Sequence, residues 1–266
     1  PTPGLNPLFS AGPGPCRGDG AILDEIAYFV SGNKLIKLTS SFVATEVGTL
    51  STNTGNVSMA SSGTQLLIVD GTNGYIFDGT TFTTIADVDF EVATVCAYMD
   101  GYFIINDVNH QGAFSISDLN DGLVWSALDY VIVESSPGAI QNIKVLHNNL
   151  FIFSSISIEP FYNSGNSDFP FDPLRNSKIE YGLQAAFSVI QADNTLYWLA
   201  ANSEGINQIV RLNGYNPEVV STREIEYELS TYSMTSDCVA YSYQQAGHVF
   251  VVLTFPVAAR TLVYDI

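Results

Sequence analysis

The sequence has few basic residues: nine lysines and arginines against 27 aspartates and glutamates, a formal net charge of −18 in 266 residues. Direct binding to DNA or anionic lipid needs clustered basic side chains, and here they are scattered along the chain. We therefore expect no direct nucleic-acid binding. Only 14% of residues are charged and 46% are hydrophobic, which excludes a disordered acidic tail.

Cysteine is also scarce. Cys16, Cys96 and Cys238 are far apart and odd in number, which excludes a disulfide framework and indicates reduced, mostly buried thiols. No apolar run approaches the ~18 residues of a membrane span, and no helix-type spacing extends over three turns. The chain opens on Pro1 without an initiator methionine, so we interpret it as part of a longer protein.

What the sequence does contain is a repeat of short, apolar, β-type runs separated by Gly, Asn and Asp. The clearest run is apolar on both faces and recurs at residues 26–30, 65–69, 101–105, 149–153, 195–199 and 248–252. Its copies end 39, 36, 48, 46 and 53 residues apart. Spacings of ~40–50 residues match the four-stranded blade of a β-propeller, where neighbouring blades cover both faces of an inner strand.

The repeat predicts an all-β fold, a β-propeller of about six four-stranded antiparallel blades. The alternative is a pair of stacked β-sandwiches made of the same meanders. We expect residues 1–23 to be a Pro/Gly-rich lead-in and residues 24–266 to form a single propeller domain. The first copy has a weak first strand, and the last copy has no fourth strand, so the terminal blade is expected to be incomplete.

Motifs for catalysis are missing. The chain has no phosphate-binding G-x-x-x-x-G-K-[ST] loop, no G-x-S-x-G elbow and no H-E-x-x-H, and its three histidines lie in different copies. We predict no catalytic residues, no cofactor and no metal. A paired-carboxylate glycosidase site would draw on acids that mostly resemble turn residues. They are Asp87, Asp89, Glu91, Glu134, Glu159, Asp168 and Asp172.

Two further patterns carry weaker hypotheses. Arg17-Gly18-Asp19 is the tripeptide that integrins bind, and an adhesion module would require it at an exposed loop tip. In residues 224–229 acidic and apolar residues alternate, which predicts a strand with Glu224, Glu226 and Glu228 on one face.

Longer phrases are more specific than these motifs. Among them are PTPGL at the start, VSMA, DGYF, FSIS, IEYG, LTFP and LVYD, at residues 1–5, 57–60, 100–103, 114–117, 179–182, 253–256 and 262–265. With Glu159 and the segment 161–171 they run in order along essentially the whole chain. Together they resemble the packaged-DNA stabilisation proteins of short-tailed, Salmonella-type phages, also called tail-hub or head-completion proteins.

The resemblance implies a non-enzymatic structural protein of the virion tail or neck, made in the host cytoplasm, with a β-propeller fold. It implies six copies beneath the portal and its adaptor ring, which help to close the channel after DNA packaging. It also implies a docking surface for the tail needle and the tailspikes. The alternative is a propeller glycoside hydrolase or sugar-binding module that acts on host surface polysaccharide, which a deep pocket with three carboxylates would favour.

The candidate docking loop is the long segment 158–175, which is rich in Phe, Asn and Pro. Its apolar residues Phe161, Tyr162, Phe169 and Phe171 either contact a partner or cap a blade, and the sequence favours neither reading.

Overall fold

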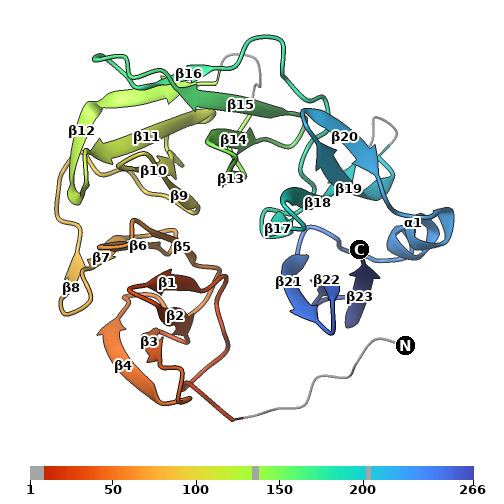
Figure 1. Ribbon diagram of the computed structural model, residues 1–266, viewed down its shortest axis with the longest axis horizontal. Coiled ribbons are helices and arrows are strands. Elements are labelled where there is room, and N and C mark those ends of the chain that lie inside the picture. Colours follow the sequence, from red (N-terminus) through yellow and green to blue (C-terminus); the bar gives the residue numbers. More distant parts are fainter. Residues whose placement is uncertain (1–8, 134–137, 202–204) are drawn as a thin grey trace. The chain divides into compact units, whose positions relative to one another are not determined.

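Almost all regular structure in the protein is β-strand. The computed structural model describes residues 9–133, 138–201 and 205–266. The chain forms two compact units, Pro1–Ile132 and Val133–Ile266, and each contains three antiparallel sheets (Figure 1). Each sheet is a meander in which successive strands pair in chain order.

The first unit contains the first, second and third sheets. Their strands are β1 (Ala21–Leu23), β2 (Ile26–Ser31), β3 (Lys34–Leu38) and β4 (Ala44–Thr49); β5 (Ser58–Ser61), β6 (Leu66–Val69), β7 (Gly74–Phe77) and β8 (Phe82–Thr84); and β9 (Cys96–Met99), β10 (Tyr102–Asn106), β11 (Ala113–Asp118) and β12 (Asp121–Ile132).

The second unit contains the fourth, fifth and sixth sheets and one helix. Its elements are β13 (Asn142–Leu146), β14 (Asn149–Phe153), β15 (Ile158–Asn163) and β16 (Phe171–Pro173); β17 (Ile190–Ala192), β18 (Thr195–Ala201), β19 (Asn207–Asn213) and β20 (Asn216–Val219); α1 (Arg223–Ser230); and β21 (Val239–Gln245), β22 (His248–Phe255) and β23 (Arg260–Asp265).

Tight turns set the register of the meanders. Between β9 and β10 the turn is Asp100-Gly101, and the flanking residues Met99 and Tyr102 pair directly. Both turn residues have positive φ, 51° and 96°. Two-residue hairpin turns need this conformation because it matches the twist of the strands, and Asp and Gly adopt it at low cost.

Within each unit the core lies between successive sheets. In β6 all four residues are buried, and they alternate between two clusters. Leu66 and Ile68 pack with residues of the first sheet, whereas Leu67 and Val69 pack with residues of the third. In β18, Trp198 likewise packs toward the fourth sheet, and Tyr197 and Leu199 toward the sixth. Coverage of both faces by neighbouring sheets fits a propeller blade and excludes one layer of a two-layer sandwich.

The structure confirms the predicted all-β fold of six antiparallel blades. Among the residues that the structure describes, five sheets have four strands and the sixth has three, as the repeat predicted. The weak first strand of the opening is β1, so residues 21–23 pair within the first blade instead of belonging to the lead-in. The lead-in also pairs with the first unit through Cys16 with Ser31 and Gly18 with Val57.

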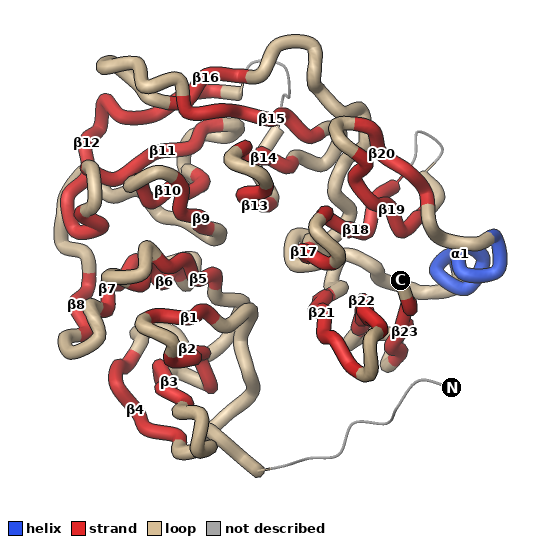
Figure 2. The backbone as a smooth tube through the Cα atoms, viewed as in Figure 1, coloured by secondary structure: helices blue, strands red, loops and turns tan. Residues whose placement is uncertain are grey.

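The prediction of a strand at residues 224–229 is wrong, because these residues form α1, the one helix of the described chain (Figure 2). The sequence pattern fits both the two-residue period of a strand and the 3.6-residue period of a helix, and packing selects the helix. Leu229 is fully buried, whereas Tyr227 is 73% exposed, although both would share one face of a strand. Glu226 is held by hydrogen bonds from Gln208 and Ser221. No helix in the described residues has the length and apolar composition that crossing a membrane requires.

Candidate functional site

The candidate docking loop forms part of the fourth blade. Its first third is β15, and β16 follows after a turn at residues 164–170. Phe161 and Phe171 are buried, at 2% and 1% exposure. Tyr162 is exposed, and Phe169 is half-buried with its ring against that of Phe171. Of the four aromatic rings of this segment, only those of Tyr162 and Phe169 are therefore accessible, and the two buried rings belong to the blade core.

The exposed face of this hairpin is hollowed. Tyr162 pairs directly with Asp172, so both side chains project from the same face. Together with Pro173, Leu174 and Arg175 they line a groove of about 410 Å³. The groove thus combines an aromatic ring, an aliphatic side chain and one charge of each sign, all within the segment that the sequence singled out.

The Arg17-Gly18-Asp19 tripeptide does not sit at an exposed loop tip. Arg17 is 4% exposed, and its guanidinium donates hydrogen bonds to backbone carbonyls of the first unit. The acceptors are Gly32, Thr52, Thr54 and Gly55. An integrin-type partner needs an accessible arginine, so the adhesion hypothesis is wrong for this site.

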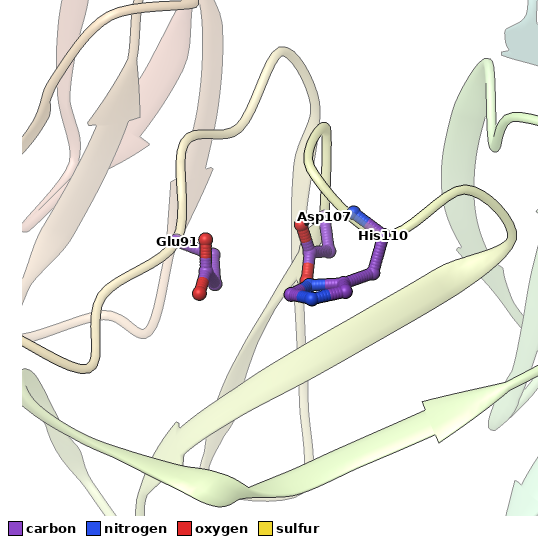
Figure 3. Close-up of side chains that lie close together, drawn as sticks. All are labelled: Glu91, Asp107 and His110. Carbon is purple, nitrogen blue, oxygen red and sulfur yellow. Dashed lines mark hydrogen bonds and ion pairs between the residues drawn. The ribbon is translucent and has the colours of Figure 1, made fainter.

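A second polar site lies in the third blade. Glu91, on the connection from β8 to β9, faces Asp107 and His110, on the turn from β10 to β11 (Figure 3). One possible ligand atom from each residue lies within 4.8 Å of those of the other two. They line a pocket of about 230 Å³ whose other lining residues are Asp89, Ser115, Ser126, Ala127 and Tyr130.

Backbone pairing brings these two segments together. The Val108 N–H donates to the Val92 carbonyl at 3.0 Å. The buried Asn106 side chain accepts the backbone N–H groups of Thr94 and Val95 at 2.9 and 3.0 Å. Glu91 and Asp107 are 16 residues apart in sequence, and this pairing places them on opposite sides of one small pocket.

The turn itself orients Asp107. Its side chain is 3% exposed, and its Oδ1 accepts the backbone N–H groups of Asn109 at 2.8 Å and His110 at 2.9 Å. Its Oδ2 lies 2.6 Å from Nδ1 of His110. This hydrogen bond and the negative charge of Asp107 raise the pKa of His110, to which the charge of Glu91 also contributes. His110 is therefore an exposed imidazole held in place by a buried carboxylate.

The acidic residues that the sequence analysis named for a carboxylate pair lie in different parts of the structure. Asp89 and Glu91 reach the pocket, whereas Asp87 accepts the backbone N–H groups of Asp89 and Trp125, which lower the pKa of Asp87. Glu159, Asp168 and Asp172 belong to the β15–β16 hairpin, and Glu134 lies outside the described residues.

Sequence reasoning missed Asp107 and did not connect it to His110. A signal was present: Asp107-Val-Asn-His110 directly follows a buried strand, and Asp at such a position often caps a turn with its carboxylate.

Three carboxylates line the pocket, which is the feature that the sequence analysis connected with a propeller glycoside hydrolase. Its volume of about 230 Å³ lies below the ~300–1,000 Å³ typical of small-molecule sites. Two serines line it as well, but no hydrogen bond joins either of them to His110 in the part of the chain that the structure describes. The arrangement suits a small cation.

Solved structures support the fold. The N-terminal domain of Nup159 matches with a TM-score of 0.53 and 12% identity, covering 96% of this chain and 75% of that one. The extracellular domain of BT4673 from B. thetaiotaomicron matches with a TM-score of 0.52 and 11% identity, covering 87% of this chain and 31% of that one. At these identities the likeness concerns the fold alone. Comparison with curated proteins finds no match.

The family comparison covers the whole chain. Residues 1–266 match the phage-stabilisation family model, described as bacteriophage P22 Gp10, beta-propeller. The blades described above and the phrases distributed along the sequence agree with this match. The chain therefore belongs to the phage-stabilisation family of bacteriophage P22 Gp10 β-propellers, which are phage structural proteins with a role in DNA stabilisation.

Proposed function

We propose that this virion protein retains packaged DNA mechanically, by closing the portal channel after packaging, and does not bind the DNA phosphates. The observation that carries the proposal is the net charge of −18 in a chain whose family stabilises DNA. Neutralising phosphates requires clustered Lys and Arg side chains, and a surplus of 18 negative charges repels the duplex. Stabilisation by shape and docking remains the physical route.

The packing of the blades supports a mechanical role. The inner strands of consecutive sheets are buried on both faces, with Trp198, Tyr197 and Phe103 among the fully buried side chains. Such close-packed interiors have low compressibility and resist deformation. A tight turn joins β9 to β10, so these strands of the third blade lie directly beside each other within the packed interior.

We further propose that the groove of the β15–β16 hairpin is a docking surface for other virion proteins. In the assembly that we infer, six copies lie beneath the portal adaptor ring and carry the tail needle and the tailspikes. Tyr162 supports this because it is exposed beside a groove of about 410 Å³, and tyrosine is enriched in interface centres. Asp172 and Arg175 at the same groove offer charged partners for specificity.

Titration of duplex DNA tests the retention mechanism. The purified protein, added to labelled duplex DNA at low salt, should leave the anisotropy of the label unchanged. A basic DNA-binding protein of similar mass serves as the positive control. Tight binding that weakens as salt is raised would refute the mechanical proposal, because that dependence reports phosphate contacts.

Substitutions in the hairpin test docking separately from folding. Tyr162→Ser should leave the melting temperature nearly unchanged and reduce the number of tail-complete virions. Tyr241→Ser is the matched control, since Tyr241 is 41% exposed and Tyr162 39%, and it lies on β21 outside the hairpin. Normal tail assembly by a folded Tyr162→Ser protein would eliminate this groove as the docking surface.

The core of the same hairpin gives the opposite pattern. Phe171→Ser removes a ring that is 1% exposed and should lower the melting temperature strongly. An assembly defect in Phe171→Ser would therefore reflect loss of folding, whereas an assembly defect in Tyr162→Ser would reflect loss of contact with a partner.

A further inference from the structure

We propose that Glu91, Asp107 and His110 form a binding site for one divalent transition-metal ion of the Zn²⁺ type. The site is independent of the docking groove and of the mechanism of DNA retention. It would fasten the connection from β8 to β9, which leads out of the second blade, to the β10–β11 turn of the third blade.

The donor atoms are close to the geometry that one ion requires. An ion held at about 2.0–2.2 Å by nitrogen and oxygen ligands separates those ligands by roughly 3–4 Å. The candidate donor atoms lie within 4.8 Å of one another, and Oδ2 of Asp107 and Nδ1 of His110 are 2.6 Å apart. Binding through Nδ1 would replace the hydrogen bond between His110 and Asp107, so the imidazole would release a proton and rotate slightly away from the carboxylate. Glu91 and His110 are exposed enough to make such rotations.

The surroundings hold the ligands in place before any ion binds. The Asn109 side-chain amide donates to Oε2 of Glu91 at 2.8 Å, and the Asn109 backbone N–H donates to Oδ1 of Asp107. One residue thus orients both carboxylates, which is how the outer hydrogen bonds of metal sites position their ligands. The Val92–Val108 backbone hydrogen bond keeps the two segments adjacent, so binding orders little additional chain.

The electrostatics favour a cation. Asp89 also lines the pocket, so three carboxylates face a space of about 230 Å³ whose lining contains no lysine or arginine. Nearby like charges in a partly enclosed site repel, and a divalent ion offsets that repulsion. A pocket this size accommodates an ion with one or two water molecules.

The donor set identifies the class of ion. Imidazole nitrogen is a ligand of Zn²⁺, Cu²⁺, Ni²⁺ and iron, whereas Ca²⁺ and Mg²⁺ prefer sites made of oxygen alone. One imidazole and two carboxylates supply three of the four positions around Zn²⁺, and water takes the fourth. We therefore choose Zn²⁺ as the probe.

Calorimetric titration of the untagged chain, treated with a chelator and then dialysed, tests the proposal. We expect one Zn²⁺ per chain and a higher melting temperature with Zn²⁺ than without. Glu91→Gln and His110→Gln should each weaken binding by at least about tenfold and abolish the thermal shift. Both side chains are partly or fully exposed, so these variants are expected to fold, which circular dichroism checks.

His248→Gln is the matched control. His248 is also exposed and its Nδ1 lies 3.0 Å from Oδ1 of Asp265, but the described chain places no third ligand beside this pair. This variant should bind Zn²⁺ as the wild type does. Absence of stoichiometric binding, undiminished binding in both site variants, an equal loss in the control, or preference for Ca²⁺ or Mg²⁺ would each overturn the assignment.

Discussion

Arg17 shows how one residue anchors the start of the chain. It is buried without an acidic partner within ion-pair distance among the described residues, and its charge is offset by four backbone carbonyls and by Oγ1 of Thr52. Thr52 in turn donates to Oδ2 of Asp70 at 2.7 Å, which brings a buried carboxylate into the same network. The planar fork of a guanidinium reaches several acceptors at once, and an ammonium group does not.

We expect Arg17→Lys to lower the free energy of unfolding by about 3 kcal/mol, because it leaves two or more buried carbonyls without a donor. Urea unfolding measures this. Arg260→Lys is the control, since Arg260 is 65% exposed and its pair with Glu228 spans 3.9 Å, and it should change stability by less than about 0.5 kcal/mol. If Arg17→Lys lowered the free energy of unfolding by less than about 1 kcal/mol, water would be replacing the lost hydrogen bonds of the guanidinium.

The thiol of Cys238 makes the free energy of unfolding depend on pH in the alkaline range. Burial, with a smaller contribution from the charge of Asp237, raises the pKa of its thiol from 9.0 to about 12. Between these values the unfolded chain releases the proton and the native chain keeps it, so the stabilising contribution is complete below pH 9 and is lost as pH rises toward 12.

The wild type should therefore lose about 1.4 kcal/mol more per pH unit than Cys238→Ala across this range. Denaturant midpoints at several pH values give the two slopes, and the variant accounts for the tyrosines and lysines that titrate alongside. Parallel slopes would mean that the thiol ionises in the native state.

At the scale of elements, periodicity identified the strands and failed at the helix. Runs that are apolar on both faces predicted β6 and β18, because two neighbouring sheets cover these strands. In residues 223–230 acids and apolar residues alternate, but Ile225 and Leu229 are also four apart. The choice between the two periods depended on which apolar residues the fifth and sixth sheets could bury.

The helical conformation of residues 223–230 predicts that two substitutions have unequal effects on stability, which a strand would not. Leu229→Ala should cost about 3 kcal/mol, because its side chain is fully buried. Tyr227→Ala should cost less than about 1 kcal/mol, because its ring is 73% exposed and alanine favours a helix. Thermal unfolding of the two variants compares them, and similar losses would support the strand instead.

At the scale of the whole molecule, the net negative charge lowers the free energy of unfolding. Twenty-seven acidic side chains repel one another, and the unfolded chain spaces them farther apart. Salt shortens the reach of that repulsion, from about 30 Å at 0.01 M to about 10 Å at 0.1 M. The folded protein should therefore become more stable as the salt concentration increases.

We expect the melting temperature to rise by a few degrees, on the order of 2–5 °C, between these two NaCl concentrations. The measurement is made with a chelator present, so that the proposed metal site does not contribute. Choline chloride is the control, because screening does not depend on the cation. A falling melting temperature would show that favourable ion pairs outweigh the repulsion.

The sequence alone determined the fold class and the repeat. Strands buried on both faces demand local apolar runs, and each tight turn demands its own Gly, Asn or Asp. Tertiary structure alone decided that Phe161 and Phe171 are core while Tyr162 is surface. It also decided that Glu91 meets Asp107 and His110, because their approach depends on backbone pairing between two separate loops, and local residue patterns do not encode which loops become neighbours.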